Sequence, residues 1–89
     1  MEILKSASAG TIESSDAYVE ISPGNGALDI EIESVVKAQF GEEITSAVRD
    51  VLAENGVNNA CVRVVDRGAL ECVIRARVET AIFRGKGEE

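Results

Sequence analysis

The segment "ALDIEIES", residues 27–34, constrains the fold more than any other part of this chain. From Leu28 to Ile32 every second residue is a large aliphatic one, and the residues between them are acidic. Side chains alternate between the two faces of a β-strand, so this pattern predicts a strand with one buried face and one strongly acidic face. Such a strand belongs in a sheet that is covered on one side only, and the rest of the chain must supply the cover.

Two other regions are expected to add strands to this sheet. Residues 9–22 read as two short strands, with Thr11 and Ile12 leading into a polar turn at residues 13–16 and "AYVEI" alternating after it. The Ser and Asp side chains of the turn are short and hydrogen-bond nearby backbone, which favours an exposed hairpin tip. Residues 57–66, "VNNACVRVVD", are rich in β-branched residues and predict a further strand.

The first of two predicted helices lies between these strands. Apolar residues recur at helical spacing from Phe40 to Leu52, which is typical of the face that a helix turns to the core. The helix begins near either Val35 or Gly41, because a glycine weakens a helix interior. The Asn55-Gly dipeptide is a suitable end for it.

The second predicted helix closes the chain. An aliphatic residue recurs at every fourth position from Leu70 to Ile82. Asp66 suits the N-cap of this helix and Gly85 suits its end. The alternation around Ile74 would also permit a strand, but the spacing of four favours a helix.

The predicted element order is therefore βββαβα. This order indicates an α+β domain, in which two helices cover one face of a small, mostly antiparallel sheet. The chain has 89 residues and no repeat or linker, so residues 1–89 are expected to form a single domain. We expect residues 9–84 to form its core and residues 1–8 and 85–89 to be flexible.

The balance of charge limits the classes of partner. The formal net charge is -7, and an acidic surface repels phosphate backbones and anionic lipids, so neither nucleic acid nor a membrane is expected as a partner. No apolar run approaches the roughly 20 residues that span a bilayer, and the N-terminus does not resemble a signal peptide. The expected location is the cytoplasm, where Cys61 and Cys72 would be unpaired and buried among aliphatic neighbours.

Catalytic chemistry is hard to build from this sequence. It contains no histidine to activate a serine nucleophile, so no catalytic residue is assigned and Ser14 and Ser15 read as turn residues. Without histidine or a paired-cysteine motif, no metal site is assigned either. Carboxylates at positions 29, 31 and 33 could hold a metal ion, but a solvated strand face is favoured. These patterns alone indicate a non-catalytic module.

Several motifs in combination go further. They are "AGT-x-E-S-x-D" near the N-terminus, "QFG" before the main helix, and "D-x-GAL-x-C-x-x-RAR-x-E" near the C-terminus. In this order and spacing, from about Ala9 to Phe83, the chain resembles the acyl carrier protein of citrate lyase, its gamma subunit. The common four-helix carrier fold, which has an Asp-Ser-Leu motif, is not matched.

The resemblance gives the serine turn a purpose. It implies that Ser14 carries a covalent phosphoribosyl-dephospho-coenzyme A, joined through a phosphodiester, whose thiol bears acetyl and citryl thioesters. It implies as partners the alpha (transferase) and beta (lyase) subunits, a prosthetic-group transferase and an acetylating ligase. The carrier would shuttle acyl groups between alpha and beta while citrate is cleaved to acetate and oxaloacetate. Many family members are expected to have glycine where this chain has Ser15. The second hydroxyl beside Ser14 makes Ser15 the second candidate for attachment.

Three other functions stay open at this point. The carrier subunit of malonate decarboxylase uses the same kind of prosthetic group. A cofactor-free protein-binding module would also suit the acidic surface. A stand-alone enzyme is the least favoured, because the chain lacks the residues that such a site needs.

Overall fold

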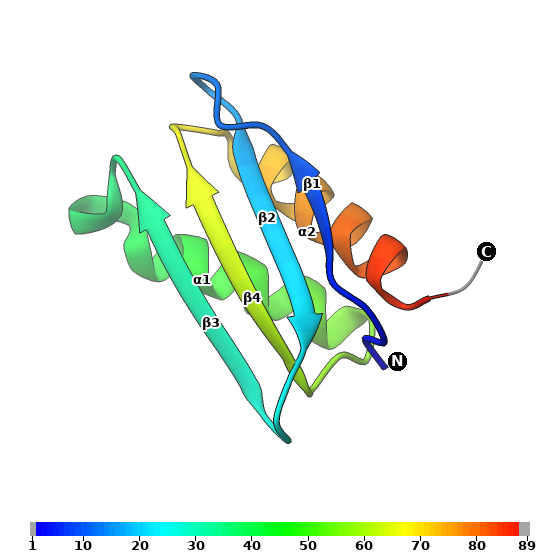
Figure 1. Ribbon diagram of the computed structural model, residues 1–89. Coiled ribbons are helices and arrows are strands. Elements are labelled where there is room, and N and C mark those ends of the chain that lie inside the picture. The colour runs from blue at the N-terminus through cyan, green and yellow to red at the C-terminus, as the bar shows by residue number, and fades with distance from the viewer. Residues whose placement is uncertain (1, 88–89) are drawn as a thin grey trace.

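The computed structural model describes residues 2–87, which form two layers (Figure 1). Four strands make one sheet, and both helices pack against the same face of it. Along the chain the elements are β1 (Ala7–Gly10), β2 (Ala17–Pro23), β3 (Leu28–Ser34), α1 (Lys37–Glu54), β4 (Ala60–Asp66) and α2 (Glu71–Gly85). The predicted order and the α+β class are confirmed.

The order of strands across the sheet is β1-β2-β4-β3. β2 is antiparallel to both β1 and β4, and β3 is parallel to β4, so α1 serves as the crossover between two parallel neighbours. Asp66 pairs in register with Ala17 on one side and Ser34 on the other. The start of β2 and the ends of β3 and β4 therefore meet at one end of the sheet, next to the turn at residues 11–16 that leads into β2.

The core between the sheet and the helices is aliphatic, as a chain with 3% aromatic residues requires. On β3 the predicted alternation is confirmed, because Ile32 is buried while its acidic neighbours are exposed. Arg63 likewise points away from the buried residues on either side of it. The largest fully buried apolar side chains are Val19, Ile21, Val48, Leu52, Val64, Val78 and Ile82.

The N-terminal region differs from the prediction. The first strand ends at Gly10, before the expected Thr11 and Ile12, because Gly10 has a φ of 91° that turns the chain out of the sheet. Ile12 is consequently 60% exposed. The segment expected to be flexible before residue 9 contains Ile3, whose side chain is only 3% exposed. Of the residues expected to be flexible, 1 and 88–89 lie outside those that the structure describes.

The helices also differ from the prediction in detail. α1 begins at Lys37, near the earlier of its two expected starts, and Phe40 at its first turn is 49% exposed. Asp66 is not the N-cap of α2: it ends β4, and Leu70 occupies the cap position with extended backbone. Cys72 is exposed, because it lies on the solvent side of the first turn of α2, so the prediction of a buried thiol is wrong there. No helix within residues 2–87 has the length and apolarity to cross a membrane.

Candidate functional site

The turn between β1 and β2, residues 11–16, presents two serine side chains to solvent. Ser14 and Ser15 are both exposed, and within residues 2–87 neither hydroxyl makes a hydrogen bond. The turn projects from one end of the sheet, so other molecules can reach it (Figure 1). A serine hydroxyl in this position is accessible, and no base among residues 2–87 is hydrogen-bonded to it.

Backbone hydrogen bonds fix this turn to the loop that joins β4 to α2. The amide of Ser15 donates to the carbonyl of Arg67 at 2.8 Å, and the amide of Arg67 donates to the carbonyl of Asp16 at 2.9 Å. Within the turn, the amide of Asp16 donates to the carbonyl of Glu13 at 3.1 Å. Hydrogen bonds therefore hold the backbone around the two serines in place, although the turn lies at an exposed tip.

The carboxylate of Asp16 is the main side-chain anchor of the turn. It accepts from the Thr11 hydroxyl at 2.6 Å, from the Ala17 amide at 2.7 Å, and from Nε and Nη2 of Arg77 at 3.1 and 2.9 Å. The guanidinium of Arg77, followed by the two other donors, holds the pKa of Asp16 well below its usual range. Asp16 therefore remains ionised at neutral pH and ties the turn to α2.

Gly10 allows this anchor to form. A Cβ at this position would collide with the carbonyl oxygen of Ala17 and would lie 3.0 Å from Cδ of Arg77. Its φ of 91° is also one that side-chain-bearing residues rarely adopt. A glycine is thus needed where β1 leaves the sheet close beside β2 and α2.

Arg67 brings a positive charge to the same place. Its backbone is hydrogen-bonded to both Ser15 and Asp16, its side chain is exposed, and its guanidinium makes no hydrogen bond or ion pair with another described residue. Arg77, by contrast, is paired with Asp16. A phosphodiester attached to this turn would carry a negative charge, and the cation of Arg67 lies within side-chain reach of it. The exposed hydroxyls and the nearby guanidinium fit such a group.

Comparison with known proteins identifies the family. Residues 4–85 match a family model described as malonate decarboxylase delta subunit (MdcD). The chain is 48% identical over 89 residues to the citrate lyase acyl carrier protein of Oenococcus oeni, spanning 100% of this chain and 92% of that protein. It is 53% identical over 88 residues to the protein of the same name from Haemophilus influenzae, spanning 99% and 92%. The chain belongs to the citrate lyase acyl carrier protein family.

A solved structure contains a chain with a similar fold. The fold of this acyl carrier protein family member matches a chain in the crystal structure of a Pseudomonas malonate decarboxylase hetero-tetramer in complex with malonate, with a TM-score of 0.78. The match covers 94% of this chain and 91% of that one, at 20% sequence identity. At this identity the likeness shows a shared fold only.

Sequence reasoning singled out the two serines of the carrier turn but missed the residues that hold them. Asp16 and Arg77 are 61 positions apart, and no local pattern joins them. A signal was present, since Gly10, Thr11, Asp16 and Arg77 all lie within the motifs that carried the resemblance. Those motifs therefore contain the residues that anchor the turn as well as the serine itself.

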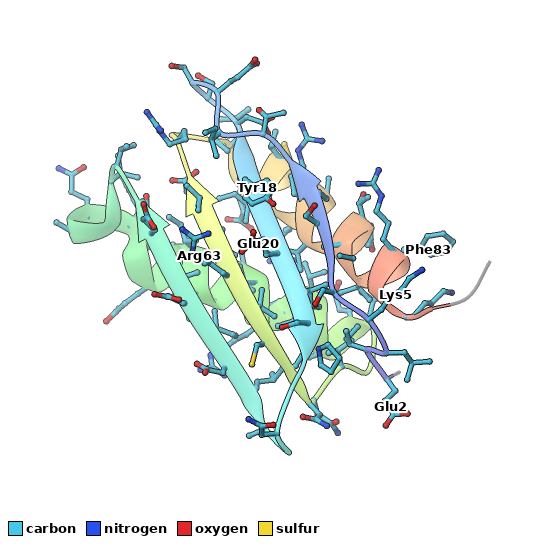
Figure 2. The ribbon with its side chains drawn as sticks, viewed as in Figure 1. Glu2, Lys5, Tyr18, Glu20, Arg63 and Phe83 are labelled. Atoms are coloured by element: carbon cyan, nitrogen blue, oxygen red, sulfur yellow. The ribbon has the colours of Figure 1, made fainter. Side chains whose placement is uncertain are left out.

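In this carrier the face of the sheet that the helices leave open is polar, and charged side chains on it pair with one another (Figure 2). Arg63 lies between two acidic residues, with its guanidinium 3.3 Å from the carboxylate of Glu20 and 3.2 Å from that of Glu33. Cross-strand pairs of opposite charge of this kind stabilise a sheet. The acidic side of β3 is therefore partly neutralised within the sheet, and in the part of the chain that the structure describes no three metal-ligating side chains come together.

Proposed function

We propose that this chain is the acyl carrier subunit of a citrate lyase, with a phosphoribosyl-dephospho-coenzyme A attached to Ser14. When bound, that group supplies a thiol that carries acetyl and citryl thioesters. The observation that supports this role most strongly is an exposed serine hydroxyl, with no hydrogen bond to any described residue, on a turn that Asp16 and Arg77 anchor to the body of the protein. Such a turn holds an attachment point that another enzyme can reach.

The geometry of the turn favours Ser14 over Ser15 as the attachment residue. Ser15 has a φ of 68°, in the left-handed region that glycine adopts most readily, and glycine is expected here in many members of the family. The left-handed backbone conformation at Ser15 is therefore required by the shape of the turn. Its amide is also engaged with Arg67, whereas Ser14 makes no backbone hydrogen bond to that loop.

The proposed role assigns partners and a location. The alpha and beta subunits of the lyase would use the carrier in turn, and a prosthetic-group transferase and an acetylating ligase would prepare it. The chain itself would be non-catalytic, positioning the arm while its partners supply the chemistry. The cytoplasm suits a protein whose two cysteines, Cys61 and Cys72, are unpaired, because thiols stay reduced there.

A pair of serine variants tests the attachment site. We expect Ser14→Ala to abolish attachment and to leave the fold intact, because an exposed turn substitution changes stability by less than about 0.5 kcal/mol. The matched control, Ser15→Ala, should still be modified. The measurement is the intact mass of each chain isolated from the native host, followed by mapping of the peptide that contains residues 11–18. Retained modification in Ser14→Ala would move the site, and an unmodified native chain would favour a cofactor-free binding module.

The carrier subunit of malonate decarboxylase is the second candidate function. The match of residues 4–85 to the malonate decarboxylase family model favours it. Identities of about 50% to proteins named for citrate lyase favour the first candidate. Reconstitution of the loaded carrier with citrate lyase alpha and beta subunits would separate the two. Citrate cleavage would support our proposal, and its absence alongside malonate decarboxylation with the other subunits would overturn it.

A further inference from the structure

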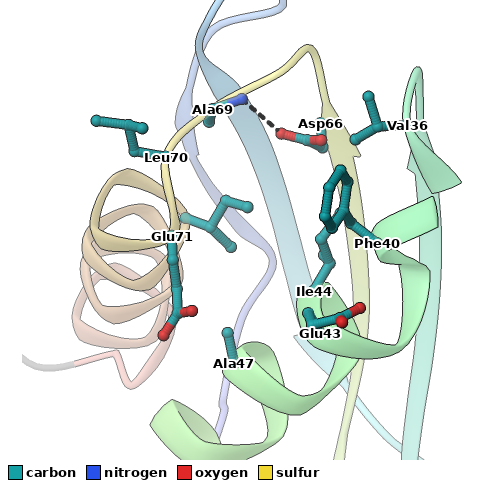
Figure 3. Close-up of a pocket in the computed structure, with 10 residues that line it drawn as sticks. Val36, Phe40, Glu43, Ile44, Ala47, Asp66, Ala69, Leu70 and Glu71 are labelled. Carbon is teal, nitrogen blue, oxygen red and sulfur yellow. Dashed lines mark hydrogen bonds between the residues drawn. The ribbon is translucent and has the colours of Figure 1, made fainter.

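An apolar pocket opens between the N-terminal halves of α1 and α2, below the end of β4 (Figure 3). Its volume is about 340 Å³. Phe40 and Leu70, which border it, are 49% and 71% exposed, although both are large apolar residues. Exposed apolar side chains around a hollow are typical of a binding site. The apolar lining is formed by Val36, Phe40, Ile44, Ala47, Leu70 and Ile74.

The buried end of this pocket contains a carboxyl group that forms no ion pair with the described residues. Asp66 is 1% exposed and accepts only two hydrogen bonds from the described residues, from the Ser34 hydroxyl at 2.7 Å and from the Ala69 amide at 2.9 Å. A carboxyl group has more acceptor lone pairs than these two bonds use, so Asp66 retains acceptor capacity at the pocket wall. In Figure 3 the ring of Phe40 lies beside it. An occupant with amide N–H groups could use this capacity.

The charge around the pocket disfavours an anionic occupant. Glu43 lines the pocket, and no cation pairs with it among the described residues. Glu71 also lines the pocket, but it is neutralised by Arg75, whose Nε lies 2.9 Å from its carboxylate. Glu43 therefore places a carboxylate without an ion pair among the described residues beside the apolar surface, and the buried end of the pocket holds the carboxyl group of Asp66. A neutral, partly apolar occupant with hydrogen-bond donors suits such a pocket, and a phosphate or carboxylate does not.

The pocket is next to the serine turn. The carbonyl of Arg67 accepts from the amide of Ser15, and Ala69, two residues further along, lines the pocket. Successive Cα atoms are about 3.8 Å apart, so Ala69 lies within about 8 Å of Arg67. A long flexible group attached to Ser14 can therefore reach the pocket without any movement of the fold.

We infer that this pocket holds the acetyl-pantetheine end of the arm attached to Ser14 while the carrier is between partners. The inference rests on the proposed function. Pantetheine is uncharged, with apolar methylene groups and two amide N–H donors, and an acetyl thioester adds no charge. The phosphates of the arm stay outside, near Arg67. A citryl thioester carries free carboxylates, whose burial in an apolar pocket beside Glu43 is unfavourable, so the citryl form leaves the pocket and is available to the lyase subunit.

The two phenylalanines of the chain provide a direct test. Phe40 lines the pocket, and Phe83 is a 65% exposed aromatic residue near the far end of α2, so it serves as an internal control. Labelling with 4-fluorophenylalanine gives two ¹⁹F resonances, which substitution of each residue assigns. We expect the Phe40 resonance to shift when the unmodified chain is compared with the acetylated one, and to return when the acetyl group is exchanged for citryl. The Phe83 resonance should stay in place.

The outcomes separate the inference from the proposed function. Intact mass first shows whether the arm is present on Ser14. If the arm is present and the Phe40 resonance does not move, or both resonances move together, the pocket does not hold its end and the inference fails while the carrier role stands. If native protein bears no arm, the carrier role fails and the inference fails with it.

A second readout uses the chemistry of the thioester. Free hydroxylamine cleaves exposed acetyl thioesters, so a group in the pocket should be protected. We expect Phe40→Ala to speed this cleavage about fivefold, which corresponds to roughly 1 kcal/mol of lost binding to the pocket. Phe83→Ala is the matched control and should react like the unsubstituted chain. Equal rates for all three loaded proteins would overturn the inference.

Discussion

Ser15 combines an ordinary side chain with a backbone conformation that glycine adopts more readily. Its φ of 68° costs a residue with a Cβ roughly 1–2 kcal/mol, whereas a glycine costs about 0.5–1 kcal/mol of extra chain entropy. We therefore expect Ser15→Gly to raise the free energy of unfolding by about 0.5–1 kcal/mol, or a few degrees in Tm. Thermal unfolding followed by circular dichroism measures this change.

The neighbouring serine is a suitable control for that substitution. Ser14 is not among the described residues with positive φ, so Ser14→Gly gains nothing from glycine and should lower stability by about 0.5 kcal/mol. If both variants were destabilised equally, the conformation of the turn would not be the reason for a glycine beside the attachment serine.

The contact between the first hairpin and α2 depends on the charge of one residue. Asp16, bonded to Arg77, has a pKa below its ordinary value of 3.8, so its folded form holds a proton less readily than its unfolded form. The stabilisation that the Asp16 carboxylate provides is therefore complete above pH 3.8, its ordinary pKa. It is lost as the pH falls from there towards the lower pKa of the folded form. We expect Asp16→Asn to be clearly less stable than the unsubstituted chain at neutral pH, with the difference shrinking below about pH 4. Urea unfolding at several pH values measures it.

An exposed ion pair between the two helices serves as a control for the Asp16–Arg77 contact. Asp50 is 55% exposed and pairs with Arg75 across the two helices. Solvent screens such a pair, so Asp50→Asn should change stability little at any pH. If Asp16→Asn behaved in the same way, the carboxylate would not anchor the turn.

The elements were largely predictable because their signals are local. The alternation of β3 and the spacing of four in α2 are each contained within one segment, and both predictions were correct. Asp66 was predicted as a helix cap because aspartate favours that position. The strand continues through Asp66, although its carboxylate does accept from an amide three residues ahead, at Ala69. The pairing of β3 with β4 and the bond from Arg77 to Asp16 join segments far apart in sequence, and no local pattern encodes them.

The two ends of the described chain close against each other, away from the serine turn (Figure 1). The amides of Leu4 and Lys5 both donate to the carbonyl of Gly85, at 2.9 and 3.1 Å, and Ile3 enters the core beside it with 3% of its surface exposed. Burial of this side chain ties the start of the chain to the end of α2.

We expect Ile3→Ala to lower the free energy of unfolding by about 2–4 kcal/mol, because it leaves a cavity in the core. Leu4→Ala, at a site 62% exposed, should cost under about 0.5 kcal/mol in the same urea unfolding experiment. Because Ile3 is remote from Ser14, the folded fraction of Ile3→Ala should still accept the prosthetic group, and loss of attachment from folded protein would show that the ends and the turn are coupled.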